Sequence, residues 1–347
     1  MGRLGMLSLG CECARIISRG DKSCCASLAA GIPEETLTDL VVLIEGNTGM
    51  KSSIVFARGA LKKIRPFHRW YLRVRPRFPV AKNPEVRTIP GVFGRVHRFD
   101  TMIFDESPES IAAYNRIGKS AWSLIENGLA LANRSPDEIE ELLDFGCGYG
   151  RVTRAIVQKI SAKKISVFDA DPNAALFCAN EFKVRPLKFT KRSGWNYDSV
   201  PFGNYDVIWA GSVFTHLSKG FTEETLSLID RLLNPNGLLI FTTHGEKTFW
   251  RLQEGQYGNR LQSLAPKIMD DFNEGGFCFI PYDREEIEIL PFRFVRAKDF
   301  GMSWMSSLFV NTLLEDVSSG RLTQLCFEPI GWDGHQDVHC YKKTSSN

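Results

Sequence analysis

The chain has 347 residues, of which 43% are hydrophobic and 24% are charged, and its formal net charge is +3. This balance is typical of a soluble globular protein with room for one large domain or two ordinary ones. No apolar run approaches the roughly 20 residues that span a bilayer, which argues against a membrane-spanning protein. The apolar part of "MGRLGMLSLGC" is too short for a signal-peptide core, and nine scattered cysteines suit a reducing compartment. We therefore expect a cytoplasmic protein.

Residues 1–60 show weak periodicity and many Gly, Ser and Cys residues, which predicts a poorly structured N-terminal extension. Four cysteines lie close together in this stretch, as CxC followed by CC. Because this spacing matches no standard zinc site, no metal is predicted.

Positive charge is concentrated between residues 51 and 100, which hold 13 Lys and Arg against 2 Asp and Glu. Segment 58–77 has eight basic residues, no acidic one and three aromatic ones. It can contact phosphate, in nucleic acid or on an anionic membrane face, or it can be a solvated helix or an arm on the acidic remainder of the chain. The second interpretation is favoured because two prolines interrupt the segment and a groove-reading motif is absent. Four prolines in residues 76–95 extend the predicted basic segment and linker over 61–105.

Further along the chain, a helical pattern begins at about residue 108, and from about 140 short apolar runs alternate with helical stretches. This alternation is typical of a parallel sheet with helices on both faces. The expected strands are 141–146, 164–169, 185–190, 205–211, 237–244, 321–330 and 337–343. The expected helices among them are 150–161, 172–183, 221–233 and 306–317. Regularity fails at about 256–303, which is long for a plain loop, so we predict a lid or acceptor insertion at 246–305.

The segment "LLDFGCGYGRVTRAI" predicts a strand, a glycine-rich turn and a helix in immediate succession. Gly146, Gly148 and Gly150 let the backbone pass close to a ligand, and the helix that follows presents free N–H groups. A dinucleotide-binding loop would have its third glycine at the position of Arg151, and it would not require Asp144 before the turn. A carboxylate at Asp144 suits the ammonium group of an amino-acid-like cofactor, and S-adenosylmethionine fits.

A second carboxylate, Asp169, ends the next predicted strand, where it can accept hydrogen bonds from both ribose hydroxyls. Asp171 is the competitor, but Asp171-Pro172 is typical of a helix cap and the first helical residue. Ala170 and Ala210, at the ends of the second and fourth strands, complete the predicted cofactor-binding set.

Four blocks now resemble the class I S-adenosylmethionine-dependent methyltransferases: "LLDFGCGYGRVTR", "ISVFDADPNAALFCAN", "YDVIWAGSVFTHLS" and "RLLNPNGLLIFTTHG". They occur in the family's order, and the chain looks closest to bacterial-type small-molecule and glycan-associated members. The resemblance implies an α/β domain over 106–347, a Rossmann-like doubly wound seven-stranded sheet with an antiparallel C-terminal hairpin strand. Many members place an acidic residue after the third strand to meet the adenine amine. Here Ser193, Gly194 and Trp195 are the candidates for that contact.

By the family topology three histidines converge on one sheet edge: His216 after the fourth strand, His244 after the fifth, and His335 in the terminal hairpin "GWDGHQD". A hydroxyl acceptor benefits from losing its proton, and histidine is the commonest general base. The candidate bases, in order, are His244, His216 and His335. Each also has a structural interpretation: His216 as a helix cap or pin, His244 as part of a turn, and His335 in hydrogen bonds across the hairpin.

Two other expectations concern the same hairpin. Asp333-Gly334 is predicted to make the turn, and Trp332 is predicted to offer a flat face to a ring such as a sugar.

The sequence thus predicts S-adenosylmethionine-dependent methyl transfer to a hydroxyl of a small molecule or glycan. A nucleic-acid methyltransferase using the 58–77 arm is disfavoured, because neither Asn/Asp-Pro-Pro-Tyr/Phe nor Pro-Cys occurs where such enzymes need it. A non-catalytic cofactor-binding module is the other alternative. An NAD-dependent oxidoreductase is disfavoured by Arg151. Peripheral contact with an anionic surface remains open for the 58–77 arm, and the oligomeric state is not predicted.

Overall fold

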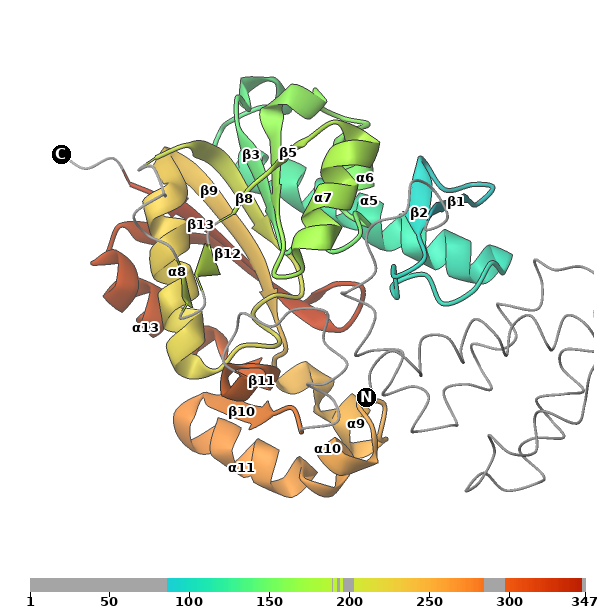
Figure 1. Ribbon diagram of the computed structural model, residues 1–347. Helices are drawn as coiled ribbons and strands as arrows, with labels where there is room; N and C mark the ends of the chain where they lie inside the picture. The colour runs from blue at the N-terminus through green and yellow to red at the C-terminus, as the bar shows by residue number, and fades with distance from the viewer. Residues whose placement is uncertain (1–85, 189, 192–193, 196–202, 284–296, 345–347) are drawn as a thin grey trace, which may run out of the picture. The chain divides into compact units, whose positions relative to one another are not determined.

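A seven-stranded sheet organises the part of the chain that this computed structural model describes, which is residues 86–344 without 189, 192–193, 196–202 and 284–296 (Figure 1). The strand order is β12-β13-β9-β8-β3-β4-β5. The strands are β3 (Leu142–Phe145), β4 (Ile165–Phe168), β5 (Arg185–Pro186), β8 (Tyr205–Ala210), β9 (Leu233–Thr243), β12 (Leu322–Trp332) and β13 (Gln336–Lys343). Every neighbouring pair is parallel except the two pairs that include β13. The predicted fold class is therefore confirmed, while the predictions for 1–60 and for the 58–77 arm lie outside the described residues.

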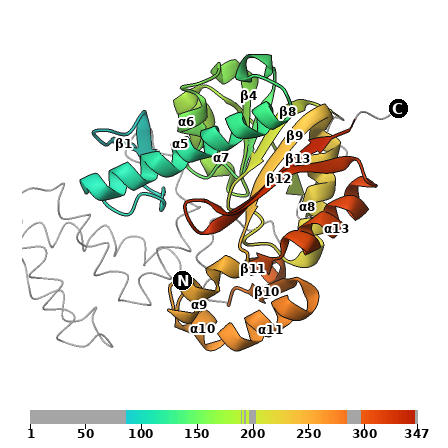
Figure 2. The same cartoon turned by 180° about the vertical axis from the view of Figure 1, so that it is seen from behind.

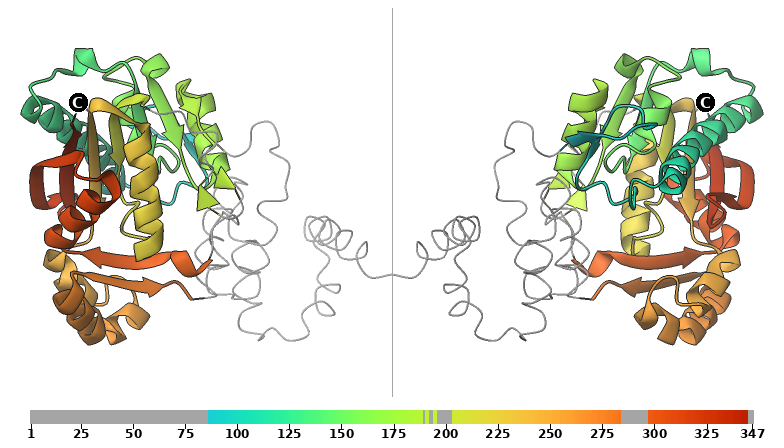
Figure 3. Two further views of the ribbon diagram at one scale, coloured as in Figure 1. Left: turned by 90° about the vertical axis from the view of Figure 1, so that its left-hand side faces the viewer. Right: turned by 90° about the vertical axis from the view of Figure 1, so that its right-hand side faces the viewer.

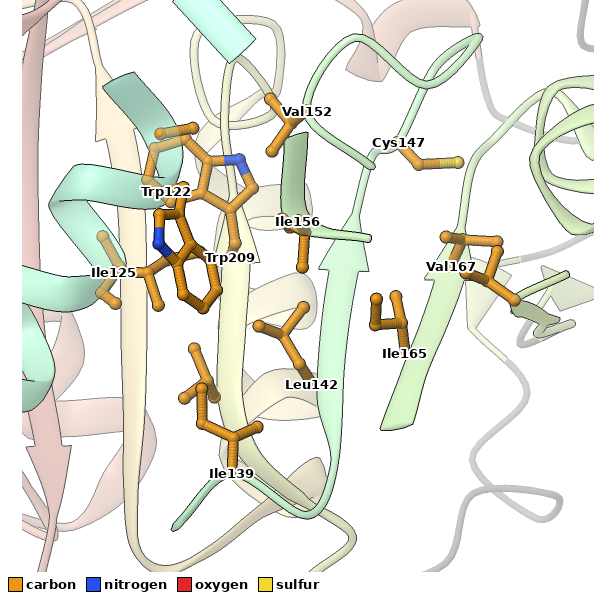
Figure 4. Close-up of a cluster of buried hydrophobic side chains, with 14 of the residues drawn as sticks. Trp122, Ile125, Ile139, Leu142, Cys147, Val152, Ile156, Ile165, Val167 and Trp209 are labelled. Atoms are coloured by element: carbon orange, nitrogen blue, oxygen red, sulfur yellow. The ribbon is translucent and has the colours of Figure 1, made fainter. Parts of the chain in front are cut away.

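Helices cover both faces of the sheet. One face carries α5 (Pro108–Leu131), α6 (Thr153–Ile156) and α7 (Pro172–Phe182), and the other carries α8 (Lys219–Leu232) and α13 (Ser307–Ser318). Figure 2 shows α5 running along its face of the sheet. Successive strand residues alternate between the two cores: Leu142 packs on the α5 side and Leu143 on the α8 side. Figure 4 shows part of the first core, in which Trp122 of α5 and Trp209 of β8 belong to one buried cluster.

Polar caps determine where the longer helices begin. The Asp171 carboxylate accepts a hydrogen bond from the Asn173 amide and precedes Pro172, so the predicted cap of α7 is confirmed. Ser218 and Ser306 cap α8 and α13 in the same manner. None of the helices in the described part of the chain is long and apolar enough to cross a membrane.

Three predicted elements differ in length from those observed. β5 covers only two residues, because Pro186 has no N–H with which to continue a ladder. The helix predicted at 150–161 is regular only over α6, and turns with (i, i+3) hydrogen bonds flank it. β9 begins at residue 233 instead of 237, because a bulge and a left-handed Asn236 (φ +63°) let the strand pass through "NPNG".

The stretch predicted to be irregular, about 256–303, is largely regular where the structure describes it, so this prediction was wrong. The insertion after β9 consists of η5 (Glu246–Thr248), α9 (Phe249–Gln253), α10 (Asn259–Ser263), α11 (Ala265–Gly275), β10 (Phe277–Pro281), η6 (Ala297–Asp299) and β11 (Gly301–Met305). β10 and β11 pair antiparallel, and Leu252, Ile268 and Trp304 centre a small core of its own. Figure 3 shows the insertion, in orange, as a separate layer beyond one end of the sheet.

Backbone hydrogen bonds attach this insertion to the residues that follow β8 and β9. The amides of Gly301 and Ser303 donate to the carbonyls of His216 and Thr215, at 3.0 Å each, and the Met305 amide donates to the His244 carbonyl at 2.8 Å. The carboxyl ends of two parallel strands therefore lie directly against the insertion, which is where an open α/β sheet binds its ligands.

The remaining short elements connect or flank the main ones. They are β1 (Val86–Thr88), β2 (Arg95–His97), η2 (Pro136–Glu138), η3 (Ala162–Lys164), β6 (Thr190–Lys191) and β7 (Gly194–Trp195). The β6–β7 hairpin contains two of the adenine-contact candidates, Gly194 and Trp195, whereas Ser193 lies outside the described residues.

Candidate cofactor and acceptor site

The glycine loop between β3 and α6 holds three glycines at positive φ: Gly146 at +86°, Gly148 at +51° and Gly150 at +85°. A Cβ atom on Gly146 would lie 2.4 Å from a methyl group of Val213, and one on Gly150 would lie 2.7 Å from the ring of Phe182. These two glycines are therefore required by packing within the protein. A Cβ on Gly148 would meet no atom of the described residues within 4 Å, so at this residue the backbone is open to a close ligand.

Two carboxylates lie at the base of the loop. Asp144 is buried and accepts a 2.6 Å hydrogen bond from the Thr153 hydroxyl; burial raises its pKa to about 7, and the nearby Asp169 carboxylate adds to the effect. Asp169 accepts hydrogen bonds from the amides of Gly148 and Asp171, both at 2.7 Å, and burial raises its pKa to about 6. Among the described residues neither carboxylate pairs with Lys or Arg, so both are able to receive a cationic or hydrogen-bonding ligand.

The two alanines of the predicted set lie beside these groups. Ala170 is half-buried between Asp169 and Asp171, and Ala210 is fully buried as the last residue of β8. Only the backbone of Ala210 is therefore positioned to meet a ligand at the sheet edge.

Residues 86–105, part of the stretch predicted as linker, pack on the glycine loop. The ring of His97 stacks on that of Tyr149 with centroids 4.4 Å apart and planes 7° apart. The buried Arg154 donates to the carbonyls of Gly150 (3.1 Å) and Phe93, and its guanidinium lies 5.1 Å from the ring centre of Phe182. Sequence reasoning missed this contribution, although the apolar spacing within "IPGVFGRVH" was a signal for it.

Two of the three candidate histidines lie side by side, and the third, His216, follows the neighbouring strand β8. His244 follows β9 and is 3% exposed, and its ring centroid lies 6.2 Å from that of His335. Burial, with further contributions from His216 and His335, lowers the pKa of His244 well below its ordinary value. The His244 Nδ1 atom is buried without a hydrogen-bond partner among the described residues. His244 is therefore neutral at pH 7 and has a free ring nitrogen.

His216 is tied to the insertion. Its Nδ1 atom lies 3.1 Å from the Gly301 carbonyl oxygen and 2.7 Å from the Tyr282 hydroxyl, and burial lowers its pKa. The helix after β8 is capped by Ser218 rather than by His216. The hydrogen bonds of the His216 ring are made with the insertion and not with the helix that it was expected to cap or pin.

The terminal hairpin is held by its own polar groups. Asp333 (φ +54°) and Gly334 (φ +66°) make the turn, as predicted. The His335 Nδ1 atom lies 3.2 Å from the Asp333 carbonyl oxygen, burial lowers the pKa of His335, and the Asp337 carboxylate accepts a 2.8 Å hydrogen bond from the Ile330 amide. Hydrogen bonds within the hairpin therefore account for Asp337 and for one nitrogen of His335.

Gln336 joins three strand ends in a way that sequence reasoning missed. Its Oε1 atom accepts from the Thr242 hydroxyl and its Nε2 atom donates to the Ser212 hydroxyl, both at 2.5 Å. The Ser212 amide in turn donates to the Thr242 hydroxyl at 2.8 Å, while Ser212 has an uncommon φ of +58°. The network fixes the backbone that follows β8 at the sheet edge.

The prediction that Trp332 faces a ligand ring was wrong. Trp332 is 2% exposed, packs edge-on against Trp209 with centroids 5.4 Å apart, and donates from Nε1 to the Ile117 carbonyl at 3.3 Å. A register shift between Glu328 and Trp332 changes which side of β12 faces the core, and the indole enters the α5 side. It stabilises the fold, and it is not available to an acceptor.

Comparison with known proteins identifies the family to which this fold and loop are similar. Residues 143–239 match the family model described as a methyltransferase domain. The chain carries a class I S-adenosylmethionine-dependent methyltransferase domain.

Several proteins are similar to parts of this methyltransferase chain. A malonyl-(acyl-carrier protein) O-methyltransferase of Halalkalibacterium halodurans is 31% identical over 126 residues, 34% of this chain and 44% of that protein. One of Paenibacillus sp. is 28% identical over 119 residues, 33% of this chain and 42% of that protein. The solved 1,6-didemethyltoxoflavin-N1-methyltransferase of Burkholderia thailandensis, with bound S-adenosylhomocysteine, is 14% identical, with 75% of this chain and 100% of that chain covered and a TM-score of 0.40. The chain spans less than half the length of the two curated relatives.

Proposed function

We propose that the protein transfers the methyl group of S-adenosylmethionine to a hydroxyl oxygen of a small molecule or glycan. One observation carries the proposal: a buried, neutral His244 with an unpartnered Nδ1 atom lies at the sheet edge where β9 ends, in the same row of strand ends as the glycine loop. A neutral imidazole in that place can accept a proton from an acceptor hydroxyl.

The cofactor would be held by two carboxylates that have no Lys or Arg partner among the described residues and by an open stretch of backbone. Asp144 would attract its ammonium group, Asp169 would accept from its ribose hydroxyls, and the open backbone at Gly148 would allow close approach. Gly146 and Gly150 would shape the loop, while Ala170 and the backbone of Ala210 would border the site. The raised pKa values of the two carboxylates support this assignment, because an ammonium group at Asp144 and hydroxyl donors at Asp169 would each lower them again.

The bound cofactor supplies a methyl group on a good leaving group, so the protein mainly has to align the acceptor and remove its proton. His244 is our first candidate for the base because its Nδ1 atom is free. His216 is second, since its Nδ1 atom is already hydrogen-bonded, and His335 is third because it is held by the Asp333 carbonyl.

An acyl group on a carrier protein is the second candidate acceptor, because the two relatives described above are malonyl-(acyl-carrier protein) O-methyltransferases. Two other functions remain as alternatives: methylation of nucleic acid, and cofactor binding without catalysis. Methylation of nucleic acid depends on the 58–77 arm, which lies outside the described residues.

Two measurements test the proposal. Calorimetry with S-adenosylmethionine should show binding that Asp169→Ala abolishes; absence of binding in the wild-type chain refutes the proposed cofactor. Methyl-labelled S-adenosylmethionine should then be incubated with hydroxylated small molecules and glycans, malonyl carrier protein and oligonucleotides. Label in a small hydroxylated acceptor that disappears with His244→Ala supports the proposal, and label confined to the carrier protein or to oligonucleotides replaces it.

A further inference from the structure

Three buried polar atoms at the end of β9 and in the insertion lack a hydrogen-bond partner among the described residues: His244 Nδ1, Arg251 Nε and Tyr257 Oη. The rings of His244 and Tyr257 have centroids 5.4 Å apart, and Trp304 borders both, at 5.8 Å from His244 and 6.0 Å from Tyr257. A buried donor without a partner costs about 1–3 kcal/mol, and such groups are rare in native proteins. Their coincidence next to the candidate base indicates that a polar ligand group satisfies them.

Arg251 is the charged member of this group. It lies in α9, and its Nη1 atom donates to the Gln256 side chain at 3.1 Å, while no carboxylate among the described residues lies within ion-pair distance of it. Its positive charge lowers the pKa values of His244, His335 and Tyr257. For Tyr257 the effect of burial is larger, so the pKa of that residue is still raised. The positive charge of Arg251 therefore belongs to the electrostatic surroundings of all three side chains, while its guanidinium lies 4.9 Å from the ring centre of Trp250.

The surrounding charges do not neutralise Arg251. Arg151, whose guanidinium lies 5.4 Å from the ring centre of Trp332, also contributes to the lowered pKa of His335. Asp333 is the acidic group beside His335, and it is already shared with Arg116 at 3.1 Å. Asp337 is another acidic group at this edge, where its carboxyl lies against the backbone of Gly245, and no carboxylate among the described residues lies within ion-pair distance of Arg251.

The geometry points to an acceptor that bears a carboxylate, which Arg251 binds while the reacting hydroxyl lies at His244. This inference rests on the proposed function and adds the substrate class: acidic sugars and hydroxy acids rather than neutral ones. A guanidinium offers paired N–H donors that match the two oxygens of a carboxylate. A phosphate would bring about two negative charges, whereas Arg251 is the one permanent cation among the described residues that contributes to the lowered pKa of His244, so a singly charged carboxylate is the better match.

Malonate and glucuronate, each paired with its neutral amide, are suitable probes. Their binding to the full chain loaded with S-adenosylhomocysteine can be measured by calorimetry or saturation-transfer NMR. The comparison uses Arg251→Met, Arg251→Lys and the control Lys267→Met, which removes an exposed positive charge of α11 that lies in an ion pair with Asp271. Circular dichroism reports whether each variant folds.

We expect at least one of the two acids to bind the wild type at least about tenfold more tightly than its amide, the equivalent of one charge-assisted hydrogen bond. Arg251→Met should remove that preference, Arg251→Lys should keep part of it, and Lys267→Met should leave it unchanged. Equal binding of acid and amide by the wild type, an unaltered preference in Arg251→Met, or no saturable binding of either acid would overturn the inference. The wild-type comparison decides the matter even if Arg251→Met fails to fold.

The same titrations separate this inference from the proposed function. If S-adenosylmethionine does not bind, the proposed function fails whatever the acids do. If it binds and methyl transfer occurs to a neutral acceptor without dependence on Arg251, only the carboxylate assignment fails.

Discussion

Gly148→Ala is the substitution that most directly probes the open side of the glycine loop. Its φ of +51° lies in the left-handed region, where an alanine costs about 1–2 kcal/mol, less about 0.4–1 kcal/mol gained by restricting the unfolded chain. The new methyl group would meet no protein atom within 4 Å. We therefore expect the free energy of unfolding to fall by only about 1 kcal/mol, the difference of those two effects.

Gly150→Ala is the matched control. It has the same backbone penalty, but its methyl group would lie 2.7 Å from Phe182 and 3.1 Å from the Cys178 sulfur, which adds an overpacking cost of about 1–3 kcal/mol. Urea unfolding should rank the two variants, with Gly150→Ala the less stable. Calorimetry should show the opposite pattern for affinity. Gly148→Ala should fold but bind S-adenosylmethionine at least about tenfold more weakly, because the new methyl group occupies space that the ligand needs.

Two results would refute this reasoning. Unchanged affinity in Gly148→Ala would mean that the open face of the loop is not where the cofactor lies. Equal stability of the two variants would mean that the contacts at Gly150 can relax at no cost.

Three further predictions concern other parts of the site. Trp332→Leu should lower the free energy of unfolding, measured by urea titration, by about 3 kcal/mol. It should leave the KM for an acceptor, measured from initial rates, unchanged. A rise in KM without loss of stability would mean that Trp332 does contact a ring of the acceptor. His244→Ala should lower kcat by about 10²–10⁴-fold with the Kd for S-adenosylmethionine unchanged, and His335→Ala should have a smaller effect; the reverse order would contradict the ranking. Because the raised pKa of Asp144 is about 7, the unligated fold should lose stability as pH rises from the ordinary aspartate range through 7. S-adenosylmethionine should bind more tightly over the same rise, as the carboxylate becomes charged, and Asp144→Asn should flatten both profiles.

The sheet and the cofactor loop could be predicted because their signals are local. In each βα unit the spacing of apolar residues changes from that of a strand to that of a helix. Asp144, Asp169 and the three glycines lie within 26 residues of one another, at the ends of two strands or directly after them. The cap at Asp171 needed only the following proline to be recognised. Family topology then ordered the strands and brought His216 and His244 to one edge.

The acceptor side could not be predicted in the same way. α9 and α10 are five residues each, too short to show a helical period, and β10 pairs with a strand that begins 20 residues after β10 ends, at Gly301. Gln336 is a partner of Ser212 and Thr242 only because β13 lies beside β9. The position of Trp332 depended on a bulge, and one shifted residue reverses the face that a strand side chain occupies.

The buried guanidinium of Arg154 has a practical consequence for anyone who shortens this chain. Carbonyl groups of Phe93 and Arg95, outside the family-matched region 143–239, take the place of water around that cation. A truncated protein that starts at α5 would keep the whole sheet but would leave a desolvated charge beneath the glycine loop with part of its hydrogen bonding removed. The smallest segment worth expressing therefore begins before Phe93.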